Sequence, residues 1–407
     1  MITPQELTAE EMASIAHLVP GPEPTLHPAA IDGPERPERT LRVCEPLLDG
    51  NERRYVDEAI DGNWISSAGP FVPRFEQAFA DAMGCAHGVA CSSGTAALHL
   101  ALGAAGIGAG DEVIVPTFTM IATANAVRFL GATEVLVDAE PHTGNLDVDL
   151  VEAKITPRTR AIVPVHVYGH PVDMAPLREL ADRHGIAVIE DAAEAHGARY
   201  RDQPVGSLGL AAAFSFFANK ILTTGEGGMV TTDDPVLAAR ARELRDLSFS
   251  TERHFWHRSV AFNYRMTNLQ AAVGLAQVER LDDLVARRRH NAARYCHALA
   301  GIDGLHLPVE HPDVHNAFWM VGITIDDSFG CTRDELRHRL AAHGIETRTY
   351  FVPMHLQPAY FHAHQGETYP VADELGRTGL YLPSSPALTD AEVDHVAREI
   401  RRAEAGG

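Results

Sequence analysis

The chain has 407 residues, of which 45% are hydrophobic and 22% charged, a composition typical of a globular protein large enough for two domains. Its 34 lysine and arginine residues stand against 55 aspartate and glutamate residues, which gives a formal net charge of −21. A chain this acidic lacks the positive field that binds nucleic acid or an anionic membrane, so we expect neither partner.

The five cysteines are scattered and odd in number, and no C-x-x-C pair occurs. This pattern excludes a fully paired disulfide framework and offers no zinc-binding spacing. No apolar run reaches the length of a membrane span, and the first residues lack the basic start and apolar core of a signal peptide. We therefore expect a soluble, cytoplasmic protein with buried free thiols.

The N-terminal segment differs in composition from the rest of the chain. Thr3 and Glu6 have the spacing of a capping box, which predicts a short helix over 3–19. Six prolines then fall within 20–37, a density typical of a linker or a loosely held arm. We expect 1–40 to form this arm, which is either inert or covers another surface of the protein.

Seven short apolar or β-branched runs follow within 41–265, and the early runs alternate with segments of helical length and periodicity. Repetition of strand, helix and strand predicts an α/β fold with a mostly parallel sheet covered by helices. The expected helices include 96–105, 121–130 and 174–184, and the expected strands are 88–91, 112–115, 134–137, 161–165, 187–190, 212–217 and 228–231.

The C-terminal part has a different organisation. A long connecting helix is expected over 266–300, because Thr267 and Gln270 form a capping box ahead of recurring apolar residues. Residues 301–407 then form a smaller α+β domain. Its expected elements are a strand at 317–325 and helices at 332–343 and 389–403.

Two groups of polar residues follow predicted strands, at the sheet edge where open α/β folds bind ligands. Ser93, Gly94 and Thr95 open a helix directly after the first strand, which suits a phosphate but also suits a plain helix cap. Asp191 ends a buried strand, and Glu194 can face the same crevice. Asp191 is either a structural hydrogen-bond acceptor or the partner of a cationic ligand atom.

A third group lies at the end of another apolar strand. Ser215 precedes Lys220, and a glycine-rich return follows the lysine. Lys220 is either a solvated loop residue or a desolvated amine that forms a Schiff base. A phosphate cradle, a carboxylate for a protonated ring nitrogen and an amine for an aldehyde are together the three anchors of pyridoxal phosphate.

The chain resembles the DegT/DnrJ/EryC1/StrS family of sugar aminotransferases, which are fold-type I pyridoxal phosphate enzymes. The resemblance runs from about Leu41 to the C-terminus and leaves out the arm. It implies a seven-stranded, mostly parallel sheet with helices on both faces and a smaller C-terminal α+β domain. The matching segments are 63–70, 92–95, 164–169, 190–197, 214–230 and 262–270.

The resemblance also implies roles for individual residues. Lys220 is expected to bind the cofactor covalently, Asp191 to pair with its pyridine nitrogen and Glu194 to lie near its ring hydroxyl. Related dehydrases have histidine in place of this lysine, so Lys220 favours transamination. The cofactor phosphate would be held by Ser93, Gly94, Thr95 and Ser215.

Further expectations concern the partner subunit and the cofactor ring. Asn263 should reach the phosphate of the neighbouring subunit's cofactor, because relatives are homodimers with shared active sites. Met120 stands where many relatives place an aromatic ring over the cofactor, and its thioether can cover a ring face. Phe118 is the nearby aromatic alternative.

His166 and His196 lie in family-like segments, so we expect them to contact the substrate, with a packing role as the alternative. Arg265 is the favoured contact for a substrate diphosphate or the donor's carboxylate. No H-E-x-x-H or similar spacing occurs, so no metal is expected. The other arginine candidates are Arg245, Arg258 and Arg348.

The expected function is transfer of an amino group from L-glutamate to the ketone of a nucleotide-linked keto-deoxysugar. GDP-4-keto-6-deoxymannose is the expected acceptor, because 64–70, 216–230 and 256–270 most resemble the perosamine synthase group, which aminates C4 of that sugar. A C3 keto-sugar nucleotide or a keto-cyclitol in antibiotic assembly is the alternative. A cofactor-binding regulator without turnover is a further alternative, which the Lys220 and Asp191 pair disfavours.

Overall fold

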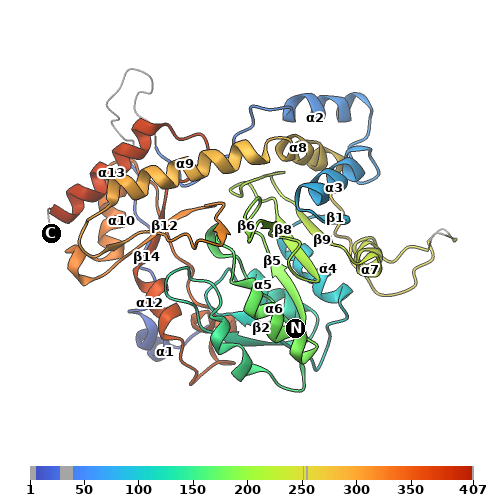
Figure 1. Ribbon diagram of the computed structural model, residues 1–407, viewed down its shortest axis with the longest axis horizontal. Coiled ribbons are helices and arrows are strands. Elements are labelled where there is room, and N and C mark those ends of the chain that lie inside the picture. The colour runs from blue at the N-terminus through green and yellow to red at the C-terminus, as the bar shows by residue number, and fades with distance from the viewer. Residues whose placement is uncertain (1–5, 28–39, 251, 254, 406–407) are drawn as a thin grey trace.

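The computed structural model describes residues 6–27, 40–250, 252–253 and 255–405 (Figure 1). Its centre is a seven-stranded sheet in the order β1-β9-β8-β5-β4-β2-β3. β9 is antiparallel to both neighbours, and the other adjacent pairs are parallel. The predicted α/β fold is confirmed, and all seven predicted strands belong to this sheet. They are β1 (His87–Cys91), β2 (Glu112–Pro116), β3 (Thr133–Val137), β4 (Thr159–Ile162), β5 (Ala187–Asp191), β8 (Ala211–Ser215) and β9 (Gly228–Thr232).

The helices around the sheet agree with the predicted alternation of strand and helix. The three helices expected from periodicity are α4, α5 and α6, each within a few residues of its predicted bounds. The helices of this part are α2 (Glu52–Asp61), α3 (Phe71–Ala82), α4 (Gly94–Ala104), α5 (Ala122–Phe129), α6 (Met174–His184) and α7 (Pro235–Arg245).

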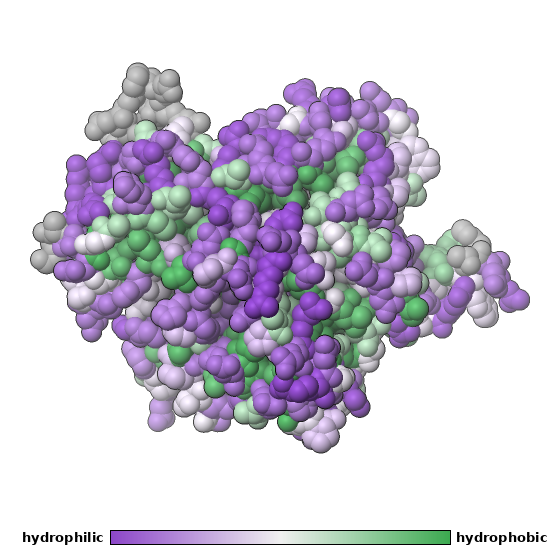
Figure 2. All heavy atoms as spheres, viewed as in Figure 1, coloured by the Kyte–Doolittle hydropathy of each residue, from purple (hydrophilic) through white to green (hydrophobic). Residues whose placement is uncertain are grey.

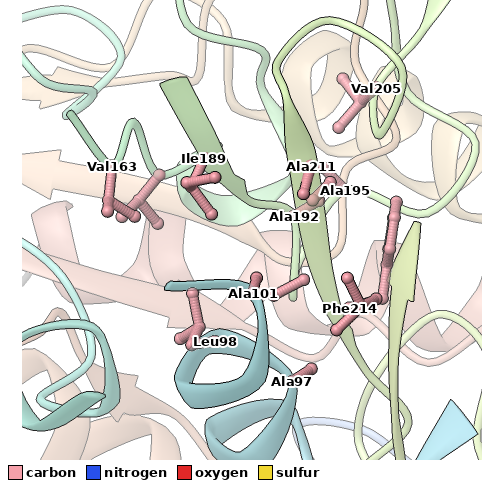
Figure 3. Close-up of a cluster of buried hydrophobic side chains, with 14 of the residues drawn as sticks. Ala97, Leu98, Ala101, Val163, Ile189, Ala192, Ala195, Val205, Ala211 and Phe214 are labelled. Atoms are coloured by element: carbon pink, nitrogen blue, oxygen red, sulfur yellow. The ribbon is translucent and has the colours of Figure 1, made fainter. Parts of the chain in front are cut away.

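Helices cover both faces of the sheet. Phe214 and Ser215 are neighbours in β8, so their side chains point to opposite faces. Ser215 lies against Gly94 of α4, whose added Cβ would be 2.6 Å from the Ser215 Cβ. Phe214 packs against Phe79 of α3, with ring centroids 4.9 Å apart. Figure 3 shows the small and branched side chains that join α4 to the central strands.

The long helix predicted after the sheet is two helices, α8 (Asn268–Val278) and α9 (Leu281–Leu299). Thr267 caps α8 through the predicted capping box. The break follows at Glu279, whose carboxylate accepts a hydrogen bond from the Tyr55 hydroxyl at 2.6 Å. A contact with α2 thus fixes the turn between the two helices, which local periodicity does not indicate.

The C-terminal part has its own hydrophobic cluster around a four-stranded sheet in the order β10-β12-β14-β13. Leu41 packs in this cluster and bridges to Ile345, although it precedes the large sheet in sequence. The predicted strand and both helices are present. The elements are β10 (Leu305–His306), β12 (Val321–Ile325), β13 (Arg348–Thr349), β14 (Gly379–Leu382), α10 (Arg333–Ala342), α11 (Pro358–Phe361), α12 (Pro370–Thr378) and α13 (Asp390–Ala405).

Short elements complete the described chain. A small sheet in the order β11-β6-β7 was not predicted, because its strands have only two residues each. Its strands are β6 (Arg199–Tyr200), β7 (Gln203–Pro204) and β11 (Val314–His315), and 3-10 turns lie at Val148–Leu150, Glu152–Lys154, Val167–Gly169, Asp327–Phe329 and Met354–Leu356.

The N-terminal helix α1 spans Ala9–Ile15 and is capped by Thr8, whose capping box includes Glu11. It therefore begins later than predicted, and Thr3, the predicted cap, lies outside the described residues. In the described part of the chain, no helix is both long and apolar enough to cross a membrane. Figure 2 shows a face dominated by hydrophilic residues, with smaller hydrophobic patches between them.

Candidate active site

A cavity of about 410 Å³ lies beyond the ends of β5 and β8. Strands β5 and β8 are parallel neighbours, so the residues that follow them meet at one edge of the sheet. The small C-terminal part closes the other side of this cavity. Among the predicted site residues, the cavity is lined by Ser93, Gly94, Thr95, Met120, Asp191, Glu194, Ser215 and Lys220.

Lys220 lies in the turn after β8, and its side chain is only 11% exposed. Its Nζ is 3.3 Å from a carboxylate oxygen of Glu194 and 3.6 Å from the ring centroid of Trp319. The whole chain contains just two lysines. The other is Lys154, whose Nζ lies over the Tyr369 ring at 5.7 Å. A buried amine in a cavity is thus a rare feature in this sequence.

Asp191 ends β5 and faces the cavity as a buried carboxylate. Its Oδ2 accepts a hydrogen bond from the Thr123 hydroxyl at 2.7 Å, and its Oδ1 accepts one from the Ala193 amide at 3.2 Å. Burial raises the pKa of Asp191, while these two hydrogen bonds and the charge of Lys220 oppose the rise. A cationic group bound in the cavity would also oppose this rise and favour the ionised carboxylate.

Glu194 is buried beside the lysine. Its Oε2 accepts a hydrogen bond from the Tyr168 amide at 2.9 Å, and its Oε1 accepts the one from Lys220. Burial raises the pKa of Glu194, and the positive charge of Lys220 is the largest effect in the opposite direction. Glu194 therefore holds the amine in place from the cavity floor.

The N-terminus of α4 forms another wall. The Ser93 hydroxyl caps the helix by accepting a hydrogen bond from the Ala96 amide at 3.1 Å. The backbone amides of Gly94 and Thr95 precede the first intrahelical hydrogen bond, which Ala97 donates. Free amides at the positive end of a helix dipole bind anions well. Glycine is required at Gly94 because a Cβ there would overlap Ser215.

Met120 lines the cavity with 53% of its surface exposed, whereas Phe118 is fully buried and does not line it. The Phe118 ring packs against Tyr168 and Phe351 instead. Of the two residues considered for covering a bound ring, only Met120 faces the cavity.

His166 and His196, which were expected to contact the substrate, do not line this cavity. Both rings are fully buried. The His166 Nε2 is 3.1 Å from a Glu190 carboxylate oxygen, and its Nδ1 accepts a hydrogen bond from the Val172 amide. His196 packs among aromatic rings, including that of Phe214 at 5.2 Å. Their placement agrees with the alternative, a role in packing.

Asn263 and Arg265 also lie outside this cavity. Asn263 is exposed and pairs through its backbone with Asp246. The Arg265 guanidinium forms an ion pair with the Asp246 carboxylate. These residues stand at the base of the segment that follows α7, which projects from the body of the molecule (Figure 1).

Several residues that line the cavity were not predicted from the sequence, or were not the favoured candidates, because they come from the distant C-terminal part. Trp319 covers Lys220, and Arg348, Phe351 and Tyr381 complete the wall. Arg348 was one of four arginine candidates, and it is the one that lines the cavity. The only local signal for this wall is the aromatic-rich composition of the passage that contains it.

This arrangement has counterparts in known proteins. The model of the DegT/DnrJ/EryC1/StrS aminotransferase family matches residues 46–401. The chain belongs to this family. It is therefore an aminotransferase, as the resemblance implied.

The chain matches curated relatives in this aminotransferase family over most of their length. The GDP-perosamine synthase of Caulobacter vibrioides is 51% identical over 360 residues, which cover 88% of this chain and 96% of the relative. The dTDP-3-amino-3,4,6-trideoxy-alpha-D-glucose transaminase of Streptomyces venezuelae is 44% identical and covers 82% of this chain and 87% of its own length.

A solved structure of the family has the same fold. The crystal structure of S. venezuelae DesV in complex with a ketimine intermediate superposes with a TM-score of 0.82 at 42% identity. The match covers 87% of this chain and 94% of DesV. The aminotransferase fold expected from the sequence is thereby confirmed.

The buried ring of His196 predicts a specific dependence of stability on pH. Burial lowers the pKa of His196 to about 3, whereas an unfolded histidine has a pKa of about 6.5. Between these values only the unfolded chain binds the proton, so lowering the pH reduces the free energy of unfolding. For one such histidine the loss between pH 7 and pH 5 is about 2 kcal/mol.

His196→Phe should remove this contribution, so its free energy of unfolding should fall less between pH 7 and pH 5 than that of the wild type. Urea denaturation at the two pH values measures the difference. His338→Phe changes an exposed histidine and is the control. An equal fall in His196→Phe and the wild type would contradict the assignment of a neutral, buried His196.

Proposed function

We propose that the chain binds pyridoxal phosphate at Lys220 and transfers an amino group from L-glutamate to C4 of GDP-4-keto-6-deoxymannose. The observation that carries the proposal is a single buried lysine placed between a carboxylate and a helix N-terminus in one cavity. The identity of 51% to a GDP-perosamine synthase supports the choice of acceptor. The identity of 44% to a transaminase named for a 3-amino sugar supports a C3 ketone as the second candidate.

The residues present suit pyridoxal phosphate. Asp191 would pair with the pyridine nitrogen, and Glu194 would lie beside the ring hydroxyl. Met120 would cover one face of the ring. The helix cap and the close approach at Gly94 suit a phosphate, because they bring several donors together and leave no room for a side chain there. The phosphate contacts would come from Ser93, Gly94, Thr95 and Ser215.

The chemistry of each residue follows from its surroundings. Pyridoxal phosphate, when bound, supplies a conjugated ring that accepts the electron pair of a substrate carbon. Asp191, fixed by Thr123, would keep the ring nitrogen protonated, which strengthens that electron demand. Lys220 would hold the cofactor and then carry the proton between the two reacting carbons. Trp319 would shield the amine from water.

The proposal includes a homodimer with shared active sites. Asn263 is exposed at the base of the projecting segment, where it would reach the phosphate bound by a second copy. Arg265 would accompany it toward the partner's substrate. The same segment exposes 57% of Trp256 and 94% of Val260, an apolar surface suited to burial against another subunit. A second copy would therefore complete each cavity.

Gly94→Ala tests the phosphate cradle. The new Cβ would lie 2.6 Å from the Ser215 Cβ, so one of the two segments must move. Such overpacking costs about 1–3 kcal/mol, and a cost of this size borne by the bound state corresponds to a loss of affinity of about fivefold to a hundredfold. Titration with pyridoxal phosphate, followed by visible absorbance, should show this loss. Gly108→Ala is the matched control, since nothing lies within 4 Å of its Cβ position; equal affinities of both variants would contradict the cradle.

Product analysis tests the reaction. Incubation with GDP-4-keto-6-deoxymannose, L-glutamate and pyridoxal phosphate should give a GDP-sugar with an amine at C4, identified by mass spectrometry and NMR. Lys220→Ala should abolish this product and the visible absorbance of the lysine-bound cofactor, while Lys154→Ala should retain both. An amine at C3 would favour the second candidate. Full turnover by Lys220→Ala would refute the assignment of the lysine.

Mixing two inactive variants tests the shared site. Lys220→Ala and Asn263→Ala should each have little activity as homodimers. Dissociation and reassociation of the mixture should restore activity, because one site of each mixed dimer receives an intact Lys220 and an intact Asn263. No recovery, with mixed dimers verified by mass spectrometry, would contradict the role of Asn263 across the interface.

A further inference from the structure

The loop that carries Met120 follows β2 directly and is held at its start by the C-terminal part of the chain. This Met120 loop comprises residues 117–121. Met120 lines the catalytic cavity, whereas Thr117 is fully buried and does not line it. The Thr117 amide donates a hydrogen bond to the Val137 carbonyl at 2.9 Å, and the Thr117 carbonyl accepts one from the Met354 amide at 2.7 Å.

The Thr117 hydroxyl contacts a buried histidine of the C-terminal part. The His355 Nδ1 lies 2.8 Å from the Thr117 Oγ1, and the His355 Nε2 lies 3.0 Å from an oxygen of the Asp373 carboxylate. A carboxylate accepts hydrogen bonds, so Nε2 donates to Asp373, and Nδ1 of the neutral ring then accepts from the Thr117 hydroxyl. The Tyr369 ring packs against His355 with the ring centroids 4.7 Å apart. The orientation of the imidazole is therefore fixed on both sides.

Asp373 is itself fixed relative to the large sheet. It lies in the first turn of α12, where the amides of Val371 and Ala372 donate hydrogen bonds to the Asp138 carboxylate at 3.1 and 2.9 Å. Asp138 directly follows β3, which pairs with β2. Because a carboxylate is stabilised at a helix N-terminus, this contact holds α12 at the edge of the sheet. His355 thus joins the Met120 loop to a helix that is anchored on the neighbouring strand.

A hydroxyl, a histidine and a carboxylate in this order activate the nucleophile of many hydrolases. Thr117 cannot have that role, because its side chain is fully buried and does not line the catalytic cavity. The loop instead leads to groups that face the cavity. The Met120 carbonyl accepts a hydrogen bond from the Thr123 amide at 3.3 Å, and the Thr123 hydroxyl donates to Asp191 at 2.7 Å. The position of Thr117 therefore affects both Met120 and Asp191.

We infer that His355 is a positioning residue for the pyridoxal phosphate ring, which it serves by holding the start of the Met120 loop. The inference rests on the proposed function. The loop would place Met120 over one face of the ring, and Thr123 would keep the Asp191 carboxylate at the ring nitrogen. His355 does not line the cavity and acts only through the loop. A small displacement of such a group is enough to disturb the orientation that the reaction requires.

Thr117→Val tests the inference, because it removes the hydroxyl and leaves the buried His355 Nδ1 without its partner. A buried acceptor without a partner is costly, so the loop should shift, and the affinity for pyridoxal phosphate should fall by about fivefold or more. The visible circular dichroism per bound cofactor should also fall, because the protein no longer fixes the orientation of the ring. Thr117→Ser retains the hydroxyl and should retain both properties.

Thr232→Val is the matched control. The Thr232 hydroxyl is also buried and donates a hydrogen bond to the Leu210 carbonyl at 2.7 Å. Thr232 lies at the end of β9 remote from the cavity, since Gly228 at the other end pairs with the cavity residue Ser215. The control therefore loses a comparable buried hydrogen bond, yet its affinity for pyridoxal phosphate and its dichroism should equal those of the wild type.

Equal affinity and dichroism of Thr117→Val and Thr232→Val would overturn the inference while leaving the proposed reaction intact. Failure of the wild type to develop visible absorbance with pyridoxal phosphate would instead refute the proposed function. A milder pair of variants applies if Thr117→Val does not fold. Asp373 is partly exposed; Asp373→Ala should lower the dichroism, and Asp373→Asn, which keeps an acceptor for Nε2, should retain it. Equal dichroism of these two variants would contradict the role of His355.

Discussion

The site depends on one lysine held by the buried carboxylate of Glu194, with the buried carboxylate of Asp191 in the same cavity. Removing charges from water is costly, and the cost is offset only when each charge is paired and hydrogen-bonded. Glu194 meets both conditions through Lys220 and the Tyr168 amide, whereas Asp191 has hydrogen bonds from Thr123 and the amide of Ala193. The parallel pairing of β5 with β8 brings these groups to one edge of the sheet. Binding a cationic ring beside Asp191 and an anion at α4 would complete this balance of charge.

A buried arginine on the long helix α9 supports the same site. Arg288 on α9 is 1% exposed and donates hydrogen bonds to the backbone carbonyls of Trp319 at 2.7 Å and Ser384 at 2.9 Å. It also reaches the Lys220 carbonyl at 3.4 Å. One buried guanidinium therefore joins the lysine turn to the segment that carries Trp319. The Lys220 amine is therefore positioned by residues from both parts of the chain, and the cavity lies between them.

The sequence predicted the large sheet well, because buried parallel strands are nearly continuous apolar runs and polar residues that follow them gather at one edge. Lys220, Asp191 and Ser215 were predictable for that reason. Contacts between distant segments could not be predicted in this way. Nothing in the sequence near Trp319 indicates that its ring covers the lysine. His166 lies beside a strand end, as a site residue would, yet Glu190 from the next strand engages its ring. That pairing depends on the register of two strands, which local pattern does not reveal.

The most direct test of the proposed site is to locate the residue to which the cofactor is attached. Reduction of the holoenzyme with sodium borohydride fixes pyridoxal phosphate to the amine that holds it, and peptide mass spectrometry then locates it. With two lysines in the chain, the result is decisive. We expect the label on the peptide containing Lys220, and we expect no label when the enzyme is first incubated with L-glutamate. A label on Lys154 or on the N-terminal amine, or no label without L-glutamate, would contradict the assignment of Lys220.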